Sequence, residues 1–156
     1  MPGEYAKASP VNFTNIHFAT HATANGESPL NSAIILSHQG DNYKLYARDV
    51  ATLPLTADLV TISACSSAGA RTYSGEGLVG LAWAFLQSGA HGVVAGLWDV
   101  SDYSSPILME SLYAGLAAGK EPADALRAAK LKMLEPGSKY ADPYYWGAFQ
   151  LYLGSR

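Results

Sequence analysis

Short, mostly apolar runs constrain the fold of this chain more than any other feature. The clearest cover residues 16–21, 59–65 and 92–98. Longer helical patterns lie over residues 77–88, 104–118 and 122–134. Strands that are apolar throughout are buried on both faces, which is typical of parallel sheets covered by helices. The sequence therefore predicts an α/β fold with a mostly parallel sheet.

The length and composition indicate a single domain with a buried core and without a nucleic-acid-binding surface. A chain of 156 residues is long enough to bury roughly two-thirds of its unfolded surface. Charged residues make up only 15% of it, below the usual quarter. The formal net charge is −3 and the ten Lys and Arg residues are scattered, whereas phosphate binding needs clustered cations. We therefore expect no nucleic-acid partner.

The lack of a recognisable targeting signal and the single cysteine favour a reducing compartment. No run reaches the 18 or so apolar residues that a membrane span requires, and the polar N-terminus does not resemble a secretory signal. Cys65 is the only cysteine, so no internal disulfide can form. We expect a cytoplasmic protein that does not bind membranes.

The other segments complete the predicted order of elements. Residues 1–12 are polar and contain two prolines, which predicts a linker or an artificial start without regular structure, followed by one domain over 13–156. The remaining predicted elements are a hairpin of strand 33–36 and turn 39–42, a brief helix over 47–52, and a closing strand in the aromatic segments 144–146 and 149–153.

Three reactive residues end predicted strands. His21 ends the first run, Cys65 the second, and Asp99 follows the third. Ligands of open parallel sheets gather at the carboxyl ends of the strands. We therefore expect these three side chains to share one crevice.

A cysteine and a histidine in one crevice suit nucleophilic acyl transfer. The thiolate is the attacking species, so Cys65 needs an imidazole such as that of His21 to take its proton. The backbone N–H groups of Cys65 and Ala22 are the predicted oxyanion donors. The alternative is that Cys65 is a small buried hydrophobe, as free cysteines often are.

Five segments together resemble the CHAT family of caspase-like domains. They are HFATH over residues 17–21, ISACS over 62–66, GEGLVGLA over 75–82, GLWDVSD over 96–102 and PYYWGAF over 143–149. The resemblance implies a caspase-like three-layer sandwich, with His21 as the catalytic histidine and Cys65 as the nucleophile. It also implies a pocket for the substrate residue before the scissile bond, with four candidates: Asp99, Asp102, Ser63 and Glu76.

The chain departs from the family pattern at three places. Ala22 stands where a glycine usually follows the histidine, and polar, uncharged residues over 103–105 replace further acidic ones. Family domains carry more strands before the histidine strand, so we expect a domain truncated on its N-terminal side. A sheet that lacks its leading strands exposes an edge that favours association. We therefore expect a homo-oligomer, or a repeat-containing regulatory segment in cis or in trans.

Other features have simpler explanations. His17 shares a strand face with His21 and is expected to be structural or to support the base. His38 and His91 are expected to be solvated, and the histidines and Cys65 show no spacing of a closed zinc site, so no metal is expected. Residues 75–80 match G-x-G-x-x-G, but the polar segment before them is no strand, which disfavours a nucleotide site.

Two functions from different classes remain open. The chain is either a cysteine endopeptidase that cleaves a protein substrate without a cofactor, or a non-catalytic or latent caspase-like module that acts through interactions. An esterase for small substrates is disfavoured because Cys65 lies in no G-x-C-x-G elbow.

Overall fold

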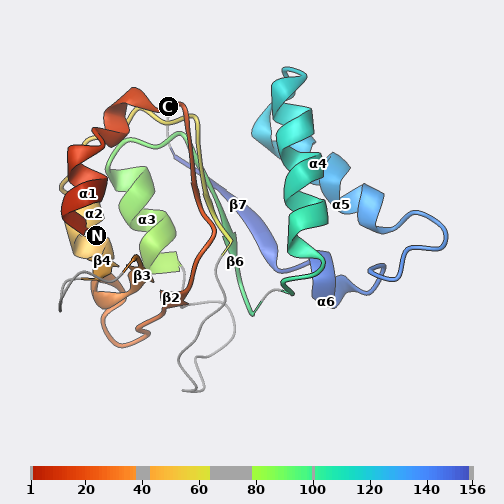
Figure 1. Ribbon diagram of the computed structural model, residues 1–156, viewed down its shortest axis with the longest axis horizontal. Helices are drawn as coiled ribbons and strands as arrows, with labels where there is room; N and C mark the ends of the chain where they lie inside the picture. Colours follow the sequence, from red (N-terminus) through yellow and green to blue (C-terminus); the bar gives the residue numbers. More distant parts are fainter. Residues whose placement is uncertain (1, 38–42, 64–78, 100, 155–156) are drawn as a thin grey trace.

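A four-stranded sheet forms the centre of the molecule (Figure 1). The computed structural model describes residues 2–37, 43–63, 79–99 and 101–154. The strands are β1 (Asn15–Phe18), β5 (Leu59–Ile62), β6 (Gly92–Gly96) and β7 (Phe149–Leu153), in the order β1-β5-β6-β7. β1, β5 and β6 are parallel, and β7 is antiparallel to β6. The predicted, mostly parallel sheet is confirmed.

Helices cover both faces of this sheet, as predicted. Helices α1 (Pro2–Lys7), α2 (Ala47–Val50) and α3 (Val79–Gln87) lie on one side in Figure 1, and α4 (Ser105–Ala117) and α5 (Pro122–Met133) lie on the other. The short elements are α6 (Pro143–Trp146) and the 3-10 turns η1 (Pro10–Asn12) and η2 (Pro29–Asn31). The arrangement is a caspase-like α/β sandwich.

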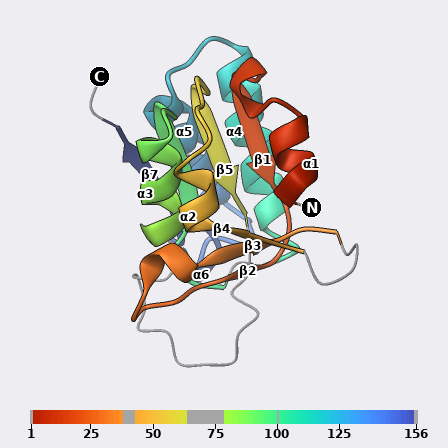
Figure 2. The same cartoon turned by 90° about the vertical axis from the view of Figure 1, so that its left-hand side faces the viewer.

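A second, antiparallel sheet lies below α2 and α3 in Figure 2. It consists of β2 (Ala22–Thr23), β3 (Ala33–Ile35) and β4 (Lys44–Tyr46), in that order. β3 and β4 form the predicted hairpin, whose turn lies outside the described residues. The chain therefore passes from β1 of the large sheet directly into β2 of the small one.

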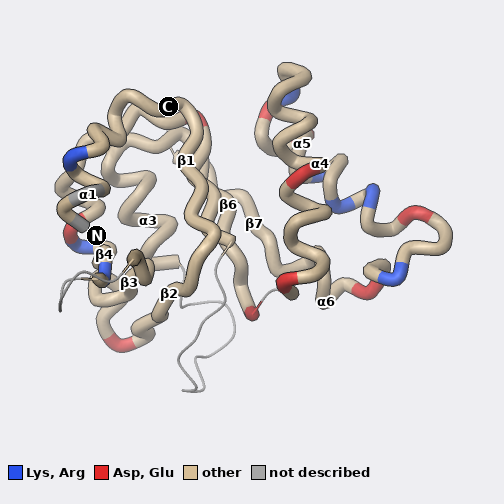
Figure 3. Tube along the Cα trace, viewed as in Figure 1, with Lys and Arg blue, Asp and Glu red and all other residues tan. Residues whose placement is uncertain are grey.

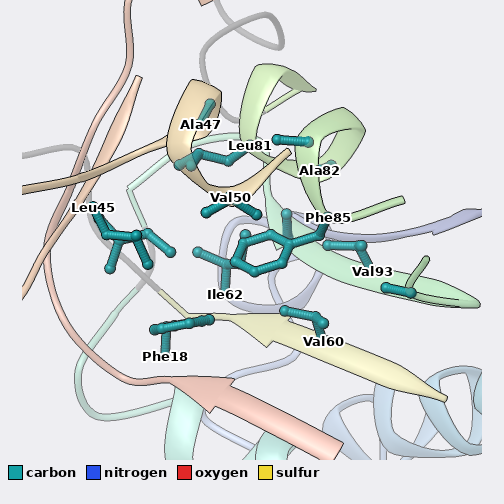
Figure 4. Packing of buried hydrophobic residues seen from close by; sticks show 14 of the residues in the cluster. Phe18, Leu45, Ala47, Val50, Val60, Ile62, Leu81, Ala82, Phe85 and Val93 are labelled. Carbon is teal, nitrogen blue, oxygen red and sulfur yellow. The ribbon is translucent and has the colours of Figure 1, made fainter. Parts of the chain in front are cut away.

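Alternate residues of the central strands pack on opposite sides of the sheet. Phe18, Val60 and Ile62 belong to the core under α2 and α3, where they point toward Phe85 (Figure 4). Leu59 belongs to the second core, under α4 and α5. This alternation fixes which side chains of β1 and β5 face α4.

Two predictions about secondary structure are wrong. Residues 2–12 form α1 and η1 rather than an unstructured linker, because Tyr5 packs on the core with its ring centroid 5.9 Å from that of Phe18. Residues 144–146 belong to α6 rather than to a strand. The Asp142 side chain accepts a hydrogen bond from the Tyr144 N–H, and Pro143 starts the turn.

Charged residues are distributed over the helices and loops (Figure 3). The four strands of the central sheet contain none. Within the described parts of the chain, no helix is both long and apolar enough to cross a bilayer.

Candidate active site

An open cleft of about 460 Å³ lies beyond the ends of β1 and β5, against the first half of α4. Its lining residues are His17, Ala19, Thr20, His21, Ser63, Asp102, Ser105, Pro106 and Met109. The carboxyl ends of parallel strands form one wall, as expected for a site in a sheet of this kind. Three of the predicted site residues, His21, Ser63 and Asp102, line this cleft together with His17.

His21 does not end a strand as predicted, because β1 already ends at Phe18; it lies three residues beyond β1 and immediately before β2. Its side chain is exposed, while its carbonyl oxygen accepts a hydrogen bond from the Ile35 N–H at 2.8 Å. The Thr20 hydroxyl donates to the Ile35 carbonyl oxygen at 2.6 Å. β3 therefore holds the backbone around His21 and leaves its imidazole accessible to the cleft.

Ser63 directly follows β5 and is held by β1 in two ways. Its N–H donates to the Phe18 carbonyl oxygen at 3.1 Å. Its Oγ lies 2.7 Å from Nε2 of His17, a hydrogen bond that either ring tautomer can make. Ser63 is the last described residue before the segment that contains Cys65.

His17 lines the cleft and its ring packs against α4. Its ring centroid lies 5.5 Å from that of Tyr113. Partial burial of the imidazole lowers the pKa of His17 below its ordinary value of 6.5. Desolvation therefore favours the neutral form of His17.

Ala22, the predicted oxyanion donor after His21, has a fully buried side chain. Ala22 lies opposite Ile34 in the antiparallel pairing of β2 and β3. The hydrogen bond next to this pair joins the flanking residues, from the Ile35 N–H to the His21 carbonyl oxygen, so Ala22 and Ile34 form a non-hydrogen-bonded pair. In such a non-hydrogen-bonded pair, the amide of the residue points away from the partner strand. The N–H of Ala22 is thus directed away from β3.

The two aspartates predicted for the substrate pocket lie in different places. Asp102 lines the cleft, whereas Asp99 is exposed and lies outside its lining. The segment between β6 and α4 is anchored at both ends. The Leu97 N–H donates to the Ala148 carbonyl oxygen at 2.9 Å, and the Ser105 N–H to that of Ser101 at 2.9 Å.

Two predicted site residues, Cys65 and Glu76, lie outside the described residues, as do His38 and positions 75–78 of the glycine motif. Gly80, the last glycine of that motif, lies in the first turn of α3. A Cβ atom there would lie 2.6 Å from the Pro29 carbonyl oxygen. This glycine therefore allows α3 to pack closely on η2.

The α4 wall of the cleft was not predicted from the sequence. Ser105, Pro106 and Met109 have no pattern that separates them from other residues near a helix start. The hydroxyl of Ser105 is buried and makes no hydrogen bond. Among the described residues, no three His, Cys, Asp or Glu side chains gather closely enough to hold a metal ion.

Comparison with known proteins identifies the family. The family model of the CHAT domain matches residues 6–155. The chain belongs to the CHAT family. The resemblance that the sequence motifs indicated is thereby confirmed, and the sheet between two helical layers agrees with it.

This CHAT domain is also similar to part of two much longer proteins. Tetratricopeptide repeat protein 28 of Mus musculus is 32% identical over 107 residues, which are 69% of this chain and 4% of that protein. Tetratricopeptide repeat protein 28 of Homo sapiens is 29% identical over the same length and the same shares. The matched part of the chain thus spans only a small fraction of these relatives.

Proposed function

We propose that this CHAT domain is a cysteine endopeptidase in which Cys65 is the nucleophile and His21 the general acid and base. The supporting observation is that His21 and Ser63 line one open cleft, and that Ser63 is two residues before Cys65 in the sequence. A protease site needs the nucleophile and its base at one accessible place.

The proposed reaction proceeds in two acyl-transfer steps. His21 takes the proton of Cys65, and the thiolate sulfur bonds to the scissile carbonyl carbon, whose oxygen becomes an oxyanion. The N–H groups of Ala22 and Cys65 are the proposed oxyanion donors. Protonated His21 gives its proton to the leaving amine as the C–N bond breaks. Water, deprotonated by His21, then hydrolyses the thioester and releases the thiol.

The cleft suits the side chain that precedes the scissile bond. Asp102 provides a carboxylate, and Pro106 and Met109 provide apolar surface nearby. A long cationic side chain would place its aliphatic part on the apolar surface and its charge near Asp102. Ser63, which also lines the cleft, and Glu76 remain proposed members of this pocket, whereas Asp99 lies outside the cleft lining.

The setting and the partners are part of the proposal. A cytoplasmic location would keep the nucleophilic thiol reduced. Self-association, or contact with a repeat-containing segment in cis or in trans, would complete or regulate the cleft. The names of the two relatives support the second arrangement, since both are tetratricopeptide repeat proteins.

A peptide-library digestion tests the proposed activity. The full chain is incubated with a library of unstructured peptides, and cleavage sites are mapped by mass spectrometry. We expect cleavage that disappears in Cys65→Ser and His21→Ala and persists in His91→Ala, whose imidazole pairs with Asp58 away from the cleft. Cleavage that survives both substitutions would contradict the proposal. A wild-type chain that is inert even with its oligomeric state and reduction confirmed would favour the interaction module.

A further inference from the structure

His17 and Ser63 form a hydrogen-bonded pair that belongs to neither half of the proposed dyad. His17 lies on β1, four residues before His21, and Ser63 follows β5, two residues before Cys65. The Nε2–Oγ distance of 2.7 Å is that of a good hydrogen bond. The pair therefore connects the two chain segments that carry the proposed catalytic residues.

Contacts with β5 and α4 accompany this solvent-exposed pair. His17 is opposite Thr61 in the parallel register of β1 and β5, and its ring packs against Tyr113 of α4. Ser63 is also held through its backbone, by the bond to the Phe18 carbonyl oxygen. β1 thus holds both the main chain and the side chain of Ser63, the last described residue before Cys65.

We propose that His17 is a positioning residue that acts through Ser63 to orient the start of the segment bearing Cys65 relative to His21. This inference rests on the proposed function. A single strand, β1, would then serve both halves of the dyad, because it leads into His21 and restrains Ser63. The imidazole does not contact the substrate in this role.

Two other roles for the pair make different predictions. If Ser63 were itself a nucleophile activated by His17, a fluorophosphonate would label it, since this reagent modifies activated serines. If the pair served only the stability of the fold, its loss would lower the unfolding temperature without changing the ionisation of Cys65. Labelling of Ser63, or an unchanged thiol titration, would overturn the proposal.

The test is the pH dependence of Cys65 alkylation by iodoacetamide in the full-length chain. His17→Phe keeps a ring against Tyr113 but removes the bond, and Ser63→Ala removes it from the other side. His17→Gln offers a side-chain amide to Ser63 and is the conservative rescue. His91→Gln is the matched histidine control.

We expect His17→Phe and Ser63→Ala to slow alkylation at pH 7 by about tenfold, because misplacement of a reacting group by about 1 Å has effects of this size or larger. Their thiol titration moves toward the free-cysteine pKa of about 8.5. His17→Gln and His91→Gln stay within about twofold of wild type. The double variant is no slower than either single variant, because both remove the same bond.

The same experiment separates failure of this inference from failure of the proposed function. If His21→Ala abolishes the rapid alkylation while His17→Phe does not change it, the positioning role is wrong and the dyad stands. If His21→Ala has no effect, the proposed function is wrong and the inference fails with it. If His17→Gln is as slow as His17→Phe, the bond to Ser63 is not what matters, and the inference is overturned.

Discussion

The N–H of Ser63 donates to the carbonyl oxygen of Phe18 at 3.1 Å, one residue beyond the last paired position of β5. The parallel pairing of β1 and β5 therefore extends to Ser63, the residue directly after β5. One chain continues to His21 and the other toward Cys65. The bond thus holds Ser63, which lines the cleft, against β1. Phe18, which accepts the bond, also belongs to the core under α2 and α3.

Phe18 is the side chain that joins this part of the cleft to the core. It is buried, and its ring centroid lies 5.5 Å from that of Phe85 in α3. We expect Phe18→Ala to lower the free energy of unfolding by about 3–5 kcal/mol, the usual effect of removing a buried ring. Urea denaturation measures this change. Phe13→Ala is the control, since Phe13 is 50% exposed. A similar loss of stability in this variant would contradict the role of Phe18 as a core residue.

Gly80 is required by the close contact between α3 and η2. An added Cβ would lie 2.6 Å from the carbonyl oxygen and 2.8 Å from the Cβ of Pro29, so backbone must move. We expect Gly80→Ala to destabilise the chain by about 1–3 kcal/mol despite the better helix propensity of alanine. Gly26→Ala, with open space around it, should change stability by less than about 0.5 kcal/mol in the same thermal or urea unfolding experiment. Equal effects at the two sites would argue against this contact.

The pKa of His17 gives a pH-dependent prediction. Partial burial of the imidazole lowers this pKa below 6.5 in the folded chain, so the unfolded chain binds the proton first as the pH falls. The stability that arises from this difference is present above about pH 6.5 and is lost as the pH falls through the folded pKa. We expect the free energy of unfolding to decline less between pH 7 and pH 5 in His17→Gln than in wild type. An NMR titration of the His17 ring with a midpoint at or above 6.5 would contradict this.

Asp102 and Asp99 provide a matched pair for testing the substrate pocket. Asp102 lines the cleft and Asp99 does not. For peptides with Lys or Arg before the cleaved bond, we expect Asp102→Asn to lower kcat/KM by about tenfold or more, the usual worth of a hydrogen bond to a charged group. Asp99→Asn should have a much smaller effect. A larger loss in the Asp99 variant would move the pocket to that side chain.

The sequence predicted most of the large elements because their signals are local. The helix expected over 122–134 is α5, Pro122–Met133, and its start follows from proline in the first turn. The strand expected over 92–98 is β6, whose five residues are all buried. Such patterns depend only on neighbours in the chain, so they can be read without knowledge of the tertiary structure.

The arrangement of the cleft depends on contacts between distant residues, which no local pattern specifies. The bond between His17 and Ser63 requires the register that puts His17 opposite Thr61. A shift of one residue would turn these side chains to the other face of the sheet. The packing of Met109 against the same cleft depends on how α4 crosses the sheet. For α6, the local signal was present in Asp142 and Pro143, but the aromatic residues that follow outweighed it.

The most direct test of the account is the rate of Cys65 alkylation by iodoacetamide between pH 5 and pH 9 in wild type and in His21→Ala. A cysteine paired with an imidazole ionises well below the free-thiol pKa of about 8.5. We predict rapid alkylation at pH 6 to 7 in wild type and a slow rate in the variant that rises only near pH 8.5. A wild-type rate that already follows the free-thiol curve, and that His21→Ala does not change, would contradict the dyad.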